Sequence, residues 1–324
     1  MIATSPADIL RFILDRIDEG LGTALVTLTG IEQGSSRGIG SQMAVAEDGR
    51  YAGSFSGGCI EAAVVSEALG TLRDDRAKLV RFGVDSPYLD IRLPCGGGVD
   101  LFFNPYPDRQ VVAGALARID GREPAAVRIS EQGVRLIDAA AEKVASGWRG
   151  EEYDIHYAPA LRIVGIGQGE DLMAFVRLAH RFGADVTALS PDAPALRLLA
   201  GEGVETVELV SRTVLPVIRS DAWTAIVFLF HERDWEEVLL PEALRLPAFY
   251  FGAVGSRRTH EGRLELLRAA QLPEEMCRAL RGPVGLIPAT RDPATLALSI
   301  LAEIAGEYHR IASHAAWMQL LAAP

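Results

Sequence analysis

The sequence contains few cysteines and no cysteine motif. Its 324 residues include three, Cys59, Cys95 and Cys277, and no two of them form a CxxC pair. An odd and sparse set of this kind argues against a disulfide framework and against a structural zinc site. We therefore expect reduced thiols, and any role they have depends on the thiol itself.

Positive charge and long apolar segments are also scarce. Lys and Arg total 32 against 43 Asp and Glu, and the net charge of -11 repels a phosphate backbone, so nucleic acid is not an expected partner. Residues 1–14 lack a basic start, and Asp8 and Arg11 interrupt their apolar run. This pattern predicts neither a signal peptide nor a membrane span, and we expect a cytoplasmic protein.

The remaining composition is that of a globular protein, with 49% hydrophobic and 23% charged residues. A prior of about one domain per 100 to 200 residues predicts two domains at this length. Changes of pattern divide the chain into an N-terminal domain (1–107), a connector with small structure of its own (108–158), a Rossmann-like domain (159–312) and a C-terminal tail (313–324).

The first domain mixes helices and strands. Apolar residues at helical spacing predict helices over 6–19 and 60–72. Short apolar runs predict strands over 23–29, 42–46, 51–55, 79–82 and 99–103. The connector adds a predicted helix over 109–119 and a hairpin through 127–129 and 134–137. An α+β fold is therefore predicted for the first domain.

From residue 160 onward, strands alternate with helices. Predicted strands cover 161–164, 186–189, 204–209, 225–230 and 248–251. Predicted helices follow the first two strands as far as residues 182 and 199, and two more cover 259–269 and 294–308. Because this alternation is typical of a doubly wound parallel sheet, we predict a Rossmann-like α/β domain.

A glycine-rich turn follows the first strand of that domain. Gly165, Gly167 and Gly169 lead into a helix, the setting in which backbone amides receive a pyrophosphate. Glu170 then places a carboxylate where a phosphate would lie, and Asp192 is the nearest substitute for the expected ribose-binding acid. Nucleotide binding and a purely structural turn both remain open.

Two further glycine-rich loops each contain a cysteine. Ser56, Gly57, Gly58 and Cys59 precede a predicted helix and Glu61, and free amides at a helix start stabilise a thiolate. The second loop holds Cys95, Gly96 and Gly97. Two such loops facing one pocket would suit a metal dithiolene, a persulfide or a redox pair. The alternative for Cys59 is a small core residue, which is also the prediction for Cys277.

Three other places carry hydroxyls, cations or a histidine at strand ends. Ser35 and Ser36 lie in a loop suited to an oxyanion, and His231 follows the strand 225–230 at the edge where open α/β sheets bind ligands. A turn suited to a phosphate holds Ser256, Arg257 and Arg258. Each has a plainer alternative: a polar turn, a solvated loop or a surface ion-pair patch.

These motifs together resemble the XdhC/CoxI accessory proteins of xanthine dehydrogenase and carbon monoxide dehydrogenase. In the first domain the resemblance rests on 34–36, 47–49, 53–61 and 95–97. In the second it rests on the Gly165 turn, His231, 252–258, 285–286 and 297–304. The resemblance makes 1–107 an XdhC/CoxI-like domain and spans nearly the whole chain.

The resemblance implies a chaperone that binds the molybdenum cofactor and protects it while a cysteine desulfurase installs its sulfido ligand. The chaperone then delivers the cofactor to a molybdenum hydroxylase apoenzyme of the xanthine dehydrogenase type. It also implies that Cys59 and Cys95 contact the molybdenum centre, that glycine-loop amides hold the pterin phosphate, and that the protein forms a homodimer.

The departures from the family pattern lie mostly in the second domain, at Glu170, Ser190 and Pro288. Two other functions therefore stay open. An NAD(P)-dependent oxidoreductase would bind its cofactor at the Gly165 turn and transfer protons through His231 and Asp234. A scaffolding protein would have kept the fold and lost the ligand.

Overall fold

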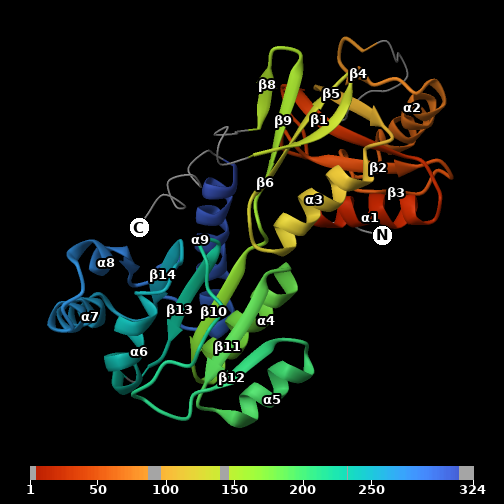
Figure 1. The fold of residues 1–324 in the computed structure, drawn as a ribbon. Coiled ribbons are helices and arrows are strands. Elements are labelled where there is room, and N and C mark those ends of the chain that lie inside the picture. The colour runs from red at the N-terminus through yellow and green to blue at the C-terminus, as the bar shows by residue number, and fades with distance from the viewer. Residues whose placement is uncertain (1–4, 87–95, 139–145, 232, 314–324) are drawn as a thin grey trace. The chain divides into compact units, whose positions relative to one another are not determined.

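A computed structural model describes residues 5–86, 96–138, 146–231 and 233–313. The chain divides into two compact units, the first ending at Pro159 and the second covering Ala160–Ala312 (Figure 1). We call them unit 1 and unit 2.

Unit 1 is built on two antiparallel sheets. A five-stranded sheet has the order β3-β2-β1-β5-β4, and a four-stranded sheet has the order β7-β6-β9-β8. The strands are β1 (Thr23–Glu32), β2 (Gln42–Ala46), β3 (Tyr51–Ala52), β4 (Lys78–Gly83), β5 (Gly98–Pro105), β6 (Ala125–Ser130), β7 (Gly133–Ile137), β8 (Gly147–Arg149) and β9 (Glu152–Tyr157). The helices are α1 (Pro6–Asp18), α2 (Glu61–Asp74) and α3 (Arg109–Asp120).

The two faces of the five-stranded sheet belong to different cores. Side chains of α2, such as Val64 and Ala68, pack on one face with Val26 of β1. On the other face, α1, α3 and the four-stranded sheet share one core with Leu25 and Phe102. The segment 108–158 is therefore an integral part of unit 1, because its apolar side chains cover a sheet face that would otherwise be exposed. Our description of it as a connector with small structure understated it.

Buried hydrogen bonds join the two sheets of unit 1. The Tyr157 hydroxyl donates to the Gln42 side-chain oxygen at 2.8 Å, and the Asn104 amide donates to the Ser130 carbonyl at 2.8 Å. Such bonds satisfy polar groups that would be costly to bury alone, and they fix how the sheets align.

Unit 2 confirms the predicted doubly wound α/β fold. All neighbouring strands are parallel, in the order β12-β11-β10-β13-β14-β15. The strands are β10 (Arg162–Gly167), β11 (Asp185–Ser190), β12 (Glu205–Glu208), β13 (Thr224–Leu229), β14 (Tyr250–Ala253) and β15 (Leu280–Arg281). The helices are α4 (Gly169–Phe182), α5 (Ala193–Gly201), the short 3₁₀ helix η1 (Arg233–Trp235), α6 (Glu236–Ala243), α7 (Arg257–Ala269), α8 (Glu274–Ala279) and α9 (Pro293–Ser313).

Helices cover both faces of the unit 2 sheet (Figure 1). One core joins the sheet to α4, α5 and α9, and the other joins it to α6, α7 and α8. The central strands β10 and β13 are mostly apolar in sequence because both of their faces are buried.

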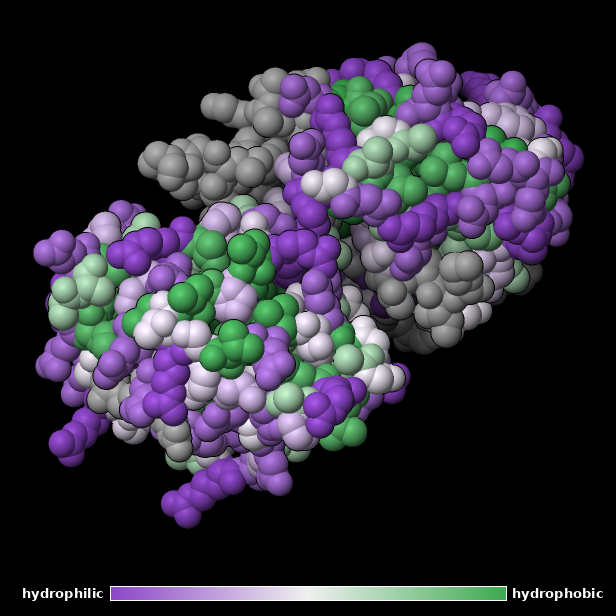
Figure 2. All heavy atoms as spheres, turned by 60° about the horizontal axis from the view of Figure 1, so that its bottom comes forward, coloured by the Kyte–Doolittle hydropathy of each residue, from purple (hydrophilic) through white to green (hydrophobic). Residues whose placement is uncertain are grey.

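Hydrophilic side chains cover much of the face seen in Figure 2, with hydrophobic groups among them. Among the described residues, the segment between β12 and β13 exposes Val210, Val214 and Val217. Within the part of the chain that the structure describes, no helix is both long enough and apolar enough to cross a membrane.

Candidate functional site

Three loops of unit 1 that the sequence singled out lie together. The loop 34–38 binds the loop 54–60, because the Ser36 hydroxyl donates to the Phe55 carbonyl at 2.8 Å and Arg37 Nε donates to the Ser54 carbonyl at 3.1 Å. The third loop, which contains Gly96 and Gly97, packs against the backbone of Gly34. A Cβ on Gly97 would lie 2.8 Å from the Gly34 carbonyl oxygen, so only glycine fits there. The structure thus brings Ser35, Ser36, Ser56–Glu61, Gly96 and Gly97 into one region.

Glu61 is the central polar group of this region. Its side chain is buried, and its two carboxylate oxygens accept six hydrogen bonds from the loop just before α2. The donors, at 2.7–3.3 Å, are the backbone N–H groups of Phe55, Ser56, Gly58 and Ile60 and the hydroxyls of Ser54 and Ser56.

The chemistry of this carboxylate follows from those contacts. Burial acts to raise the pKa of Glu61, but the hydrogen bonds from Ser56 and Ser54 outweigh it and lower the pKa to about 2. Glu61 therefore holds its own loop. The sequence also made Glu61 a candidate for cofactor contact; in the structure both of its carboxylate oxygens accept hydrogen bonds from this loop.

The structure also changes the expected setting of Cys59. Helix α2 begins at Glu61, with Ile60 as its N-cap, so the cysteine lies two residues before the helix. The amides expected to support its thiolate donate to Glu61 instead, while the Cys59 N–H donates to the Ser56 hydroxyl at 2.9 Å. Cys59 itself is exposed, so the alternative of a small core residue is wrong.

The other two cysteines differ from Cys59. Cys95 lies outside the described residues, and its contact with the molybdenum centre stays a prediction. Cys277 is buried in unit 2, where its sulfur lies 3.8 Å from the Leu272 carbonyl oxygen, as expected for a core residue.

In unit 2, the glycine turn joins β10 to α4. A Cβ on Gly165 would lie 3.2 Å from side-chain carbons of Leu172 and Val176, and one on Gly167 would lie 2.5 Å from the Leu229 carbonyl oxygen. These two glycines permit close packing of the helix and of β13 against β10. At Gly169 nothing lies within 4 Å of the Cβ position, so that residue borders open space.

An open pocket of about 570 Å³ lies at this turn. Its lining comes from the segments that follow β10, β11, β12 and β13, at the carboxyl edge of the sheet, where such folds bind ligands. The lining residues are Gln168, Gly169, Pro191, Asp192, Arg212 and Trp235. The Arg212 guanidinium lies 5.2 Å from the centre of the Trp235 ring and 2.8 Å from Asp234. Sequence reasoning missed Arg212 and Trp235, although each follows a predicted strand.

The acidic groups of this pocket have partners within the chain. The Asp192 carboxylate caps α5, because its Oδ1 accepts from the Ala195 N–H at 3.1 Å. His231 is exposed, and its Nε2 lies 3.1 Å from the Asp171 carboxylate at the start of α4. The histidine and the glycine turn therefore do lie at one edge of the sheet, as predicted.

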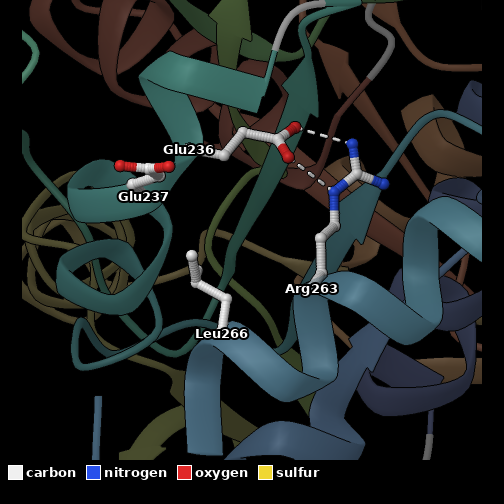
Figure 3. A pocket seen from close by; sticks show the side chains of 4 residues that line it. All are labelled: Glu236, Glu237, Arg263 and Leu266. Carbon is white, nitrogen blue, oxygen red and sulfur yellow. Dashed lines mark hydrogen bonds and ion pairs between the residues drawn. The ribbon is translucent and has the colours of Figure 1, made fainter. Parts of the chain in front are cut away.

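The predicted phosphate turn stands at the start of α7. Ser256 is the N-cap, accepting from the Thr259 N–H at 3.1 Å, while Arg257 and Arg258 are exposed. One turn further on, Arg263 makes a buried, two-bond ion pair with Glu236 of α6 (Figure 3). A small cavity of about 60 Å³ beside that pair is lined by these two residues, Glu237 and Leu266.

The described residues include no group of three or more His, Cys, Asp or Glu side chains that could hold a metal ion. A metal held by such side chains among these residues would therefore have at most two of them as ligands, with the others coming from groups that the metal brings with it. Cys59 is the exposed soft donor in unit 1.

Comparison with known proteins assigns the chain to a family. Residues 17–83 match the model described as the XdhC and CoxI family, and residues 163–304 match the XdhC Rossmann domain. The chain is 35% identical over 299 residues to the molybdenum cofactor insertion chaperone PaoD of Escherichia coli (strain K12), covering 92% of this chain and 87% of that protein. The protein belongs to the XdhC and CoxI family.

Two further relatives are more distant. The chain is 25% identical over 287 residues to the uncharacterized protein YqeB of Escherichia coli (strain K12), covering 84% of this chain and 41% of that protein. A crystal structure from Bacillus halodurans, described as a xanthine dehydrogenase, superposes with a TM-score of 0.73 at 18% identity, covering 93% of this chain and 96% of that one. At that identity the likeness supports the fold alone.

Proposed function

We propose that this protein binds the molybdenum cofactor as cargo, protects it while a cysteine desulfurase installs the sulfido ligand, and delivers it to a molybdenum hydroxylase of the xanthine dehydrogenase type. The relative PaoD, which carries the name of a molybdenum cofactor insertion chaperone, supports this proposal. The observation that carries it is the exposed Cys59 thiol, held on a loop whose backbone is fixed by hydrogen bonds.

The residues near Cys59 fit such a cargo. The cofactor combines a sulfur-rich metal centre with a phosphate, which suit a soft thiolate and a cation respectively. Arg37 supplies the cation: its Nε–H donates to the Ser54 carbonyl, and its side chain is otherwise exposed. In this proposal Cys59 contacts the molybdenum centre, with Cys95 as the second contact. Arg37 takes the place of the loop amides in holding the phosphate, because those amides donate to Glu61.

A second candidate function concerns unit 2. The open pocket at the Gly169 turn is placed where Rossmann domains bind dinucleotides, which favours NAD(P) binding and, with it, the oxidoreductase alternative. Glu170 and Asp171 in the first turn of α4 argue against a tightly bound pyrophosphate there.

One titration separates the two functions. The purified protein is mixed with molybdenum cofactor in anaerobic buffer and desalted, and the retained pterin is measured, with NAD(P)H run in parallel. We expect stoichiometric retention that falls at least tenfold in Cys59→Ala and Cys95→Ala but not in Cys277→Ala, the matched control for a buried thiol. NAD(P)H binding without pterin retention would overturn the chaperone proposal and favour the oxidoreductase.

The partners can be tested with the same variants. We expect the loaded protein to form complexes with a molybdenum hydroxylase apoenzyme and with a cysteine desulfurase, and to be a homodimer by light scattering. Cys59→Ala should still bind the apoenzyme while failing to activate it. An unchanged activation by Cys59→Ala would favour the scaffolding role instead.

A further inference from the structure

The loop 54–60 has the shape of an oxyanion-binding site. The N–H groups of Phe55, Ser56, Gly58 and Ile60 point inward, aided by positive φ angles at Gly57 (73°) and Gly58 (127°), which let the backbone curve around a centre. Two serine hydroxyls complete the ring of donors. Sites of this kind hold phosphate or carboxylate ligands in other proteins. Here the centre is occupied by the carboxylate of Glu61.

We infer that Glu61 is a positioning residue: its carboxylate acts as a built-in anion that fixes the loop 54–60 and thereby presents Cys59, and its removal leaves a site for a free oxyanion. The significance of Cys59 rests on the proposed function, but the positioning itself concerns only this chain. The ligand class for the emptied site is a small carboxylate, since that is what the site holds now.

The coupling to Cys59 runs through one hydroxyl. The Cys59 N–H donates to Ser56 Oγ at 2.9 Å, and that hydroxyl donates to Glu61 Oε2 at 2.7 Å. The N–H of the preceding residue, Gly58, donates to the same carboxylate oxygen at 2.8 Å. The backbone on the N-terminal side of Cys59 is therefore tied to Glu61, while the thiol stays exposed.

An empty site would be unfavourable for the loop. Without the carboxylate, the N–H groups of Phe55, Ser56 and Gly58 lose the acceptor that they share. An unpaired donor is costly where it is buried, as at Phe55, and less so at the half-buried Ser56 and the exposed Gly58. The loop then rearranges, or it accepts an anion from solution in place of the carboxylate. The contacts of Ser36 and Arg37 with the loop carbonyls remain and limit how far it can move.

The test uses the full-length protein in three variants: Glu61→Ala, Glu61→Gln and, as a matched control on the same helix, Glu67→Ala, whose carboxylate pairs with Lys78. Hydrogen exchange of the 54–60 peptide and the rate of Cys59 alkylation by iodoacetamide are followed by mass spectrometry at fixed pH. We expect both rates to rise at least fivefold in Glu61→Ala and Glu61→Gln and to stay unchanged in Glu67→Ala.

Sodium acetate is the probe for the emptied site, with sodium chloride at equal ionic strength as its control. Acetate should restore the slow rates in Glu61→Ala but not in Glu61→Gln, whose amide fills the space. Wild-type rates in a folded Glu61→Ala, or accelerated rates that acetate leaves unchanged, would overturn the inference. If Glu61→Ala fails to fold, wild-type exchange in Glu61→Gln overturns it, and fast exchange confined to 54–60 supports it. None of these measurements involves the molybdenum cofactor, so this inference and the proposed function can fail separately.

Discussion

Two of the glycine-rich turns, the one before α2 and the one before α4, look alike in sequence but differ in what their backbone N–H groups face. Before α2, the loop 54–60 closes around the chain's own Glu61. Before α4, Gly169 borders an open pocket, and the nearby Asp171 pairs with His231. A turn whose backbone N–H groups are bonded within the chain is held in place and can present a side chain, here Cys59. A turn that borders a pocket can instead bind a ligand through its N–H groups.

Glu61→Gln should produce the largest change in stability. Because the folded pKa of about 2 lies below the ordinary 4.5, the carboxylate stabilises the fold fully above pH 4.5 and loses this effect as the pH falls toward 2. The shift corresponds to about 3 kcal/mol. Urea unfolding of wild type and Glu61→Gln between pH 7 and pH 2.5 should show a difference in the free energy of unfolding of that order, and this difference should become smaller below pH 4.5. A difference that does not depend on pH would contradict a lowered pKa of Glu61.

Alanine substitutions should then separate the two turns. Gly167→Ala places a Cβ 2.5 Å from the Leu229 carbonyl oxygen and should cost about 2–3 kcal/mol, because backbone must shift. Gly57→Ala meets nothing within 4 Å and should cost about 1 kcal/mol, from its positive φ alone. Chemical denaturation measures both. An equal loss in the free energy of unfolding for Gly167→Ala and Gly57→Ala would mean that the two turns do not differ in how closely they are packed.

A similarly small effect is expected at Asp192. Asp192→Ala removes the cap of α5 and should destabilise unit 2 by about 1 kcal/mol. Asp192→Asn, which keeps an oxygen acceptor, serves as the control and should lose less. If either variant abolished NAD(P)H binding measured by fluorescence while leaving stability unchanged, Asp192 would be a ligand-binding acid and the capping interpretation would be wrong.

The sequence predicted unit 2 better than unit 1. Runs such as 225–230 are apolar throughout, which is typical of a strand buried on both faces, and the structure has β13 there. The helix α6 was missed because it contains Pro241 and follows the polar stretch 231–234. In unit 1 the strand expected over 51–55 ends at Ala52, since Gly53 has φ of 94°, which lies outside the β region.

The site was predicted by location more than by role. The sequence placed Ser36, Cys59 and Gly97 among the candidates, and the structure brings their loops together. It did not predict that Glu61 turns back onto its own loop, although a glutamate three residues after Gly58 has the spacing of a capping interaction. Contacts between loops, such as Arg37 with Ser54, depend on the sheet order and could not be read from either loop alone.

The central claim is that Cys59 contacts the molybdenum centre of the bound cofactor. X-ray absorption at the molybdenum edge, recorded under anaerobic conditions on the free cofactor and on the wild-type and Cys277→Ala complexes, tests it most directly. We predict one more sulfur neighbour at molybdenum in the wild-type complex than in the free cofactor, with Cys277→Ala matching wild type. Identical molybdenum–sulfur coordination in the free cofactor and in both complexes would contradict the claim.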